Sequence, residues 1–139
     1  MRTVLTDSQV LSALRQIAAE SPEKVYEAPG NMRDGWDTCY YVHRDEDGTE
    51  SPGCIVGQVL HRLGVPLADL KGVETLGAIT VVQRITEGVS DGVAVFLREV
   101  QRKQDRGYAW GEAVADALEE HGGIHLTGPT LSAVGESAA

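Results

Sequence analysis

The stretch CYYVHRDEDGTESPGC, residues 39–54, decides the fold class of this 139-residue chain. Its first part is rich in aromatic and β-branched residues, which favour a strand, and the dipeptide Asp47-Gly48 follows. Asp-Gly is typical of a type I′ hairpin turn, because both central residues of that turn need a positive φ. The chain is therefore predicted to return through Thr49-Glu50 as a small, acidic β-hairpin.

A helix is predicted directly after the hairpin, over residues 52–63. Ser51 is placed as its N-cap, and Pro52 takes the first helical position, where a missing N–H costs nothing. Gly57 lies inside this helix and weakens it by about 1 kcal/mol relative to Ala. A packing reason is expected for that glycine, namely another segment that crosses the helix closely.

Three further helices are predicted over residues 7–20, 91–106 and 109–121, each from apolar residues at helical spacing. The first has complete start signals, because Thr6 is a good N-cap and Gln9 three residues later completes a capping box. The two later helices contribute the largest side chains of the predicted core, Phe96 and Trp110.

The whole chain is predicted to be α+β: a single, mostly helical domain of about four to five helices with a small acidic β-hairpin. This globular domain is placed at residues 1–126. Residues 76–86 fit both a strand and a helix, and we favour the helix. Residues 127–139 combine Gly, Ser, Pro and Ala with little apolar content, so a flexible C-terminal tail is expected there.

The formal net charge of −9 argues against nonspecific nucleic-acid binding, which depends on Lys and Arg at phosphates. A host protein with a basic surface is a better partner for this chain. Six carboxylates in and beside the hairpin are predicted to form the face that meets it: Asp34, Asp37, Asp45, Glu46, Asp47 and Glu50. A homodimer is left open.

Nothing in the sequence predicts a membrane segment or an export signal. The apolar runs are far shorter than the ~20 residues that span a bilayer, and the first residues, MRTVLTD, lack the apolar segment of a secretory signal. The protein is therefore expected in the cytoplasm, which would be the host cytoplasm if a phage encodes it. Cys39 and Cys54 are expected to be reduced in that compartment.

Cys54 is a candidate nucleophile, because the positive end of a helix lowers the pKa of a thiol in its first turn. His43 or His125 would serve as its base. The interpretation we favour is structural: Cys54 packs as a small apolar side chain, and no residue is assigned a catalytic role.

Cys39, His43 and Cys54 are by residue type an alternative set of metal ligands. His61 does not join them, because it lies seven residues from Cys54 on the same predicted helix, a rise of about 10 Å. No C-x-x-C or H-x-x-x-H spacing supports the remaining three residues. We therefore expect neither a metal ion nor a cofactor.

Arg98, Arg102 and Arg106 recur at every fourth residue with Lys103 beside them, so one helix face would carry a short basic stripe able to bind phosphates. The neighbouring acids Glu99 and Asp105 offset that charge, and no aromatic residue is interleaved to stack on bases. A solvated helix face is the interpretation we favour for this stripe. The usual nucleotide-binding and hydrolase motifs are absent from the sequence.

Two blocks of sequence carry a resemblance. The first is YVH at 41–43 with SPGCIVG at 51–57 and LHRLGV at 60–65, and the second is QRKQDRG at 101–107 with WGEAV at 110–114. Together they resemble a group of small uncharacterised actinobacterial and actinophage proteins of the mycobacteriophage type. The resemblance implies an origin in a phage or mobile element of a GC-rich lineage, and it transfers no catalytic residue.

Three functions from different classes follow. We favour a small acidic, non-enzymatic binding module, encoded by a phage or mobile element, that binds and modulates a host protein through protein–protein interaction. The first alternative is a Cys54-dependent enzyme with His43 or His125 as base. The second alternative is a nucleic-acid accessory protein that uses the Arg98/Arg102/Arg106 stripe.

Overall fold

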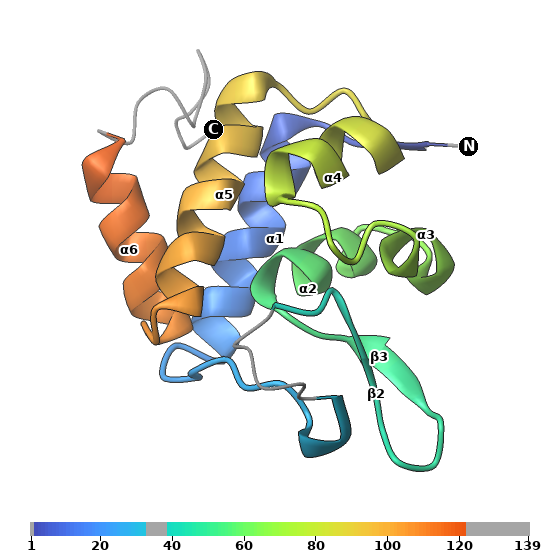
Figure 1. Ribbon diagram of the computed structural model, residues 1–139. Coiled ribbons are helices and arrows are strands. Elements are labelled where there is room, and N and C mark those ends of the chain that lie inside the picture. The colour runs from blue at the N-terminus through green and yellow to red at the C-terminus, as the bar shows by residue number, and fades with distance from the viewer. Residues whose placement is uncertain (1, 33–38, 122–139) are drawn as a thin grey trace.

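The computed structural model describes residues 2–32 and 39–121, and its helices pack around a central helix with a hairpin at one side (Figure 1). The fold is α+β and mostly helical, which confirms the predicted class. Along the chain the elements are β1 (Thr3–Val4), α1 (Asp7–Glu20), the 3-10 turn η1 (Gly30–Met32), β2 (Val42–Arg44), β3 (Glu50–Pro52), α2 (Ile55–Arg62), α3 (Leu67–Lys71), α4 (Ala78–Ile85), β4 (Thr86–Glu87), α5 (Asp91–Asp105) and α6 (Trp110–Glu120). The domain boundary predicted at 126, the predicted tail 127–139 and His125 lie outside the described residues.

Helix α1 begins and ends where its local signals predict. The backbone N–H of Gln9 donates to the Thr6 hydroxyl at 3.1 Å, and the Thr6 N–H donates to the Gln9 side chain at 2.8 Å. This capping box satisfies two N–H groups that have no partner within the helix. One apolar face of α1 then packs against α2, α5 and α6, so that α1 lies at the centre of the helical layer (Figure 1).

Helices α5 and α6 confirm the two later helix predictions. Ser90 caps α5 by accepting the Val93 N–H at 3.2 Å. Phe96 and Trp110 are 1% and 2% exposed, as expected for core residues. The first N–H of α6, on Trp110, donates to the Lys24 carbonyl at 2.8 Å, so the connection after α1 satisfies the start of α6.

Residues 76–86 are helical over α4, which confirms the helix interpretation. The chain then leaves the helix at Thr86 and forms β4, which pairs in parallel with β1. Neither this two-residue ribbon nor the short helix α3 was predicted. An element of two to five residues is too short to show a hydrophobic period, and only its tertiary pairing defines it.

The prediction that a helix starts at Pro52 with Ser51 as its N-cap is wrong. Pro52 is the last residue of β3, and α2 begins at Ile55 with Cys54 as its N-cap. The reason is pairing with the opposite strand: the Gly53 N–H donates to the Tyr41 carbonyl at 2.8 Å, and the Cys54 N–H donates to the Tyr40 carbonyl at 2.9 Å. These bonds extend the hairpin ladder past Pro52 and delay the helix.

The hairpin itself is confirmed, but its turn differs from the type I′ prediction. The Gly48 N–H donates to the Asp45 carbonyl at 2.9 Å, so Glu46 and Asp47 are the central residues of the turn. Gly48 follows with a φ of 89°, and the Asp45 N–H closes the loop by donating to the Thr49 carbonyl at 2.9 Å. A three-residue loop that ends on a left-handed glycine is the next most common hairpin connection.

Candidate functional site

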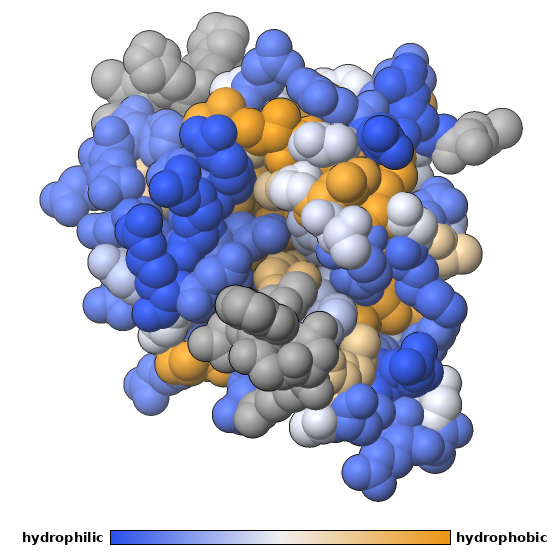
Figure 2. All heavy atoms as spheres, viewed as in Figure 1, coloured by the Kyte–Doolittle hydropathy of each residue, from blue (hydrophilic) through white to orange (hydrophobic). Residues whose placement is uncertain are grey.

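The far end of the β2–β3 hairpin carries consecutive exposed carboxylates. Figure 1 shows the hairpin projecting from the helical body, and Figure 2 shows that its far end is hydrophilic. Asp45, Glu46 and Asp47 are all exposed there. The Thr49 N–H donates to the Asp47 carboxylate at 2.9 Å and lowers the pKa of Asp47 below its ordinary value. We call these three residues the acidic tip.

The other predicted members of the acidic face do not add to this tip. Glu50 lies in β3, and its carboxylate pairs with the Lys71 ammonium of α3 at 2.6 Å. Its charge is therefore offset within the molecule. Asp34 and Asp37 lie outside the described residues. Of the six predicted carboxylates, the structure places three together at the tip and one in an ion pair.

A carboxylate that the sequence analysis did not single out holds the base of the hairpin. Glu74 accepts the Tyr41 N–H at 2.8 Å and the Val42 N–H at 2.9 Å, one on each oxygen. Burial raises the pKa of Glu74, and the two backbone N–H groups partly oppose that rise. Because Glu74 is 32 residues from Val42 in the chain, no local spacing signals this contact.

The hairpin strand also lies directly on α2. A methyl group at Gly57 would overlap the Tyr41 carbonyl group, which confirms that another segment crosses this helix closely. A methyl group at Gly53 would likewise overlap the Tyr40 carbonyl oxygen and the His43 ring. Glycine is needed at both positions because backbone approaches backbone there.

His43 contacts a tyrosine and not a cysteine thiol. Its Nε2 lies 2.8 Å from the Tyr26 hydroxyl, which also accepts the Tyr40 N–H at 3.0 Å. Burial raises the pKa of Tyr26 to about 12. Burial also lowers the pKa of His43, and the nearby Lys24 charge acts in the same direction. Both groups are therefore held in their neutral forms near pH 7.

The expectation of reduced cysteines is wrong in this structure, because Cys39 and Cys54 form a disulfide. Their Cα atoms are 5.8 Å apart, within the range of about 4.4–6.8 Å that disulfides span. The physical reason is the hairpin pairing, which brings residue 39 beside the start of α2. Cys54 is fully buried in the core, as the structural interpretation expected, and Cys39 is partly exposed.

This bond removes the basis of both alternative sites at the cysteines. A disulfide sulfur is not a thiolate, so Cys54 in this state is neither a nucleophile nor a metal ligand. The set Cys39, His43 and Cys54 has its two sulfur atoms bonded to each other. Over residues 2–32 and 39–121 no group of three or more His, Cys, Asp or Glu side chains is arranged to hold a metal ion.

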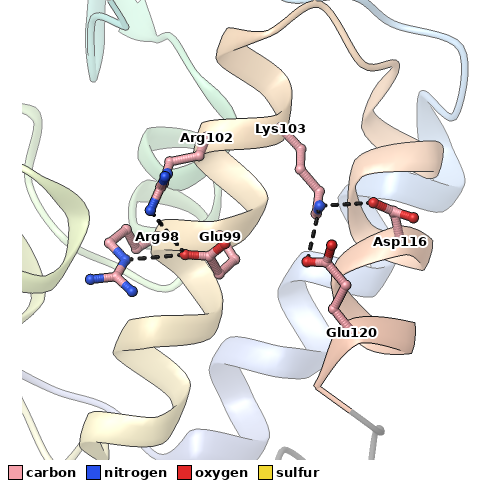
Figure 3. A network of polar contacts seen from close by, with 6 residues as sticks. All are labelled: Arg98, Glu99, Arg102, Lys103, Asp116 and Glu120. Carbon is pink, nitrogen blue, oxygen red and sulfur yellow. Dashed lines mark hydrogen bonds and ion pairs between the residues drawn. The ribbon is translucent and has the colours of Figure 1, made fainter.

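The arginine stripe of α5 is partly offset by one carboxylate (Figure 3). Arg98 and Arg102 both approach one oxygen of Glu99, at 3.3 and 3.4 Å, and Arg106 is exposed near the end of the helix. Lys103 does not extend the stripe, because it points to the other side of α5, toward α6 (Figure 3). One carboxylate offsets one of the three positive charges, and the three arginines are partly or fully exposed to solvent.

No family model matches this chain, and no curated protein or solved structure matches it either. The resemblance to actinophage proteins therefore stays a prediction. Within the part of the chain that the structure describes, no helix has the length and apolar character needed to cross a membrane.

Proposed function

We propose that this protein is a small non-enzymatic binding module, encoded by a phage or mobile element, that binds a host protein in the cytoplasm. The acidic tip makes the contact, and the partner presents a basic surface. The observation that carries the proposal is the placement of Asp45, Glu46 and Asp47, which are consecutive, exposed and at the end of a projecting hairpin (Figure 1).

The base of the hairpin supports this function, because a charged tip binds best when its scaffold is already ordered. Glu74 holds Tyr41 and Val42, and the Gly53 and Cys54 N–H groups donate to carbonyls of the opposite strand segment. Little backbone freedom is then lost on binding, which lowers the entropic cost of association.

The net charge of the chain supports a basic partner. A formal charge of −9 attracts positively charged proteins over distance and speeds their encounter. That long-range attraction is screened beyond about 10 Å at 0.1 M salt, so association should slow as salt is added.

The test uses a variant and a charge-matched control. The tip variant carries Asp45→Asn, Glu46→Gln and Asp47→Asn. The control carries the Glu→Gln change at Glu23, Glu112 and Glu119, which are exposed and lie elsewhere. Both variants lose three negative charges from −9 and therefore have a formal net charge of −6.

A polybasic peptide serves as the first probe, and a captured host protein as the second. The tip variant is expected to bind at least about tenfold more weakly, which is about 1.4 kcal/mol, while the control stays within about threefold of wild type. Equal losses in both variants would show that only net charge matters. That result would contradict a binding site at the tip.

A further inference from the structure

The disulfide closes the hairpin into a covalent ring. Cys39 and Cys54 are separated by 15 residues, and β2, the acidic tip and β3 all lie between them. We propose that this disulfide is redox-exchangeable. A thiol reductant attacks it at the Cys39 sulfur, and the reduced hairpin becomes more mobile while the helices stay folded. The inference stands on the geometry of the isolated protein and does not depend on the proposed partner.

The two cysteines differ in exposure, and this difference sets the direction of attack. Cys54 is fully buried, whereas Cys39 is partly exposed at the edge of the core. An attacking thiolate must reach the sulfur with which it bonds. The reachable residue is Cys39, so the Cys54 sulfur is the leaving group.

The position of Cys54 suits a leaving thiolate. Cys54 is the N-cap of α2, and its side chain makes no capping hydrogen bond in the oxidised state. The N–H groups of a first helical turn have no partner within the helix, and the positive end of the helix dipole stabilises an anion there.

The exchange balances with two equivalents of a small thiol such as glutathione. The first thiolate bonds to the Cys39 sulfur, the S–S bond breaks, and its electron pair goes to the Cys54 sulfur. A second thiolate then attacks the thiol-derived sulfur of the mixed disulfide, releases Cys39 as a thiolate and forms the disulfide of the small thiol. Two electrons pass to the protein, and the protons of the two small thiols end on Cys39 and Cys54.

The fold keeps its other contacts when the disulfide is reduced. The base of the hairpin keeps the two Glu74 bonds, to Tyr41 and Val42, and the Gly53–Tyr41 bond of the ladder. The contacts among α1, α2, α5 and α6 are made by residues of those helices, which include neither cysteine. Reduction therefore releases the ring constraint on residues 39–54 without removing the core.

The chemical test treats the native protein with glutathione, quenches it in denaturant with an alkylating reagent and maps the products by mass spectrometry. The expected product carries glutathione on Cys39 and the alkyl group on Cys54. Glutathione on Cys54, or a disulfide that reacts only when the helices unfold, would overturn the proposal.

Amide hydrogen exchange supplies the second readout. In the reduced protein, amide exchange in residues 43–52 is expected to become faster by on the order of 100-fold, the loop-closure effect expected for 15 residues. Helices α1 and α5 are expected to keep their protection. The Cys39→Ser variant, which changes a partly exposed residue, should show the same fast hairpin exchange with or without reductant. The proposal is overturned if hairpin exchange is equal in both redox states, or if the helices lose protection together with the hairpin. The comparison of oxidised and reduced wild-type protein supplies this result even if the variant does not fold.

Discussion

The side-chain oxygen of Gln104 accepts the backbone N–H of Ile55 at 2.8 Å, across 49 residues of sequence. Gln104 is 1% exposed, so this bond from α5 satisfies the first N–H of α2 inside the core. A buried N–H without a partner would cost about 1–3 kcal/mol. Gln104 thus completes a helix start at which Cys54 makes no side-chain capping bond.

Replacing Gln104 with Met should therefore destabilise the protein by about 1–3 kcal/mol, because Met keeps the shape and loses the acceptor. Urea unfolding measures the change. Gln101→Met is the control: Gln101 lies one turn earlier on α5 and makes only a long bond of 3.4 Å, to the Tyr41 hydroxyl. A loss at Gln104 no larger than that at Gln101 would show that the buried bond contributes little.

Gly57 and Gly92 should respond oppositely to the same substitution. Gly57→Ala forces a methyl group into the Tyr41 carbonyl and should destabilise by about 1–3 kcal/mol despite the better helix propensity of Ala. Gly92→Ala in the first turn of α5 meets only the Ser90 hydroxyl at 3.9 Å and should stabilise by about 0.4–1 kcal/mol. Thermal unfolding of both variants measures the sign, and a stabilising Gly57→Ala would contradict the close crossing.

Glu74 should make the free energy of unfolding depend on pH. Burial raises its folded-state pKa above the ordinary value of 4.5, so the folded protein binds this proton more tightly than the unfolded chain does. Its contribution is full below pH 4.5 and is lost as the pH rises through the folded pKa. Denaturant unfolding between pH 4 and 7 should show this loss in wild type but not in Glu74→Gln, and identical pH slopes would be evidence against it.

Lys103 should hold α6 against α5. Its ammonium lies 2.7 Å from Asp116 and 3.0 Å from Glu120, and its side chain is 6% exposed (Figure 3). Lys103→Met leaves both carboxylates without their shared cation, so the melting temperature should fall and amide exchange in α6 should rise. Arg98→Gln is the matched control, because Glu99 keeps Arg102 as a partner. If both substitutions change the melting temperature and the α6 exchange equally, Lys103 does not hold α6 against α5.

The sequence by itself determined the helices whose signals are local. Thr6 and Gln9 are three residues apart and Ser90 caps Val93 three residues on, so α1 and α5 begin where the pattern predicts. The acidic residues of the tip could also be predicted, because Asp47 and Gly48 mark a turn between strand-forming residues. Interactions over three or four residues are present in the chain before it folds.

Only the tertiary structure decided the start of α2, the disulfide and the anchoring of the hairpin. Pro52 carries a local helix signal, but strand pairing with Tyr40 and Tyr41 outweighs it, because a ladder bond satisfies an N–H that would otherwise be buried without a partner. Glu74 and the Cys39–Cys54 bond depend on the same pairing. Contacts between segments this far apart become defined only once the core has brought the segments together, so no spacing in the sequence predicts them.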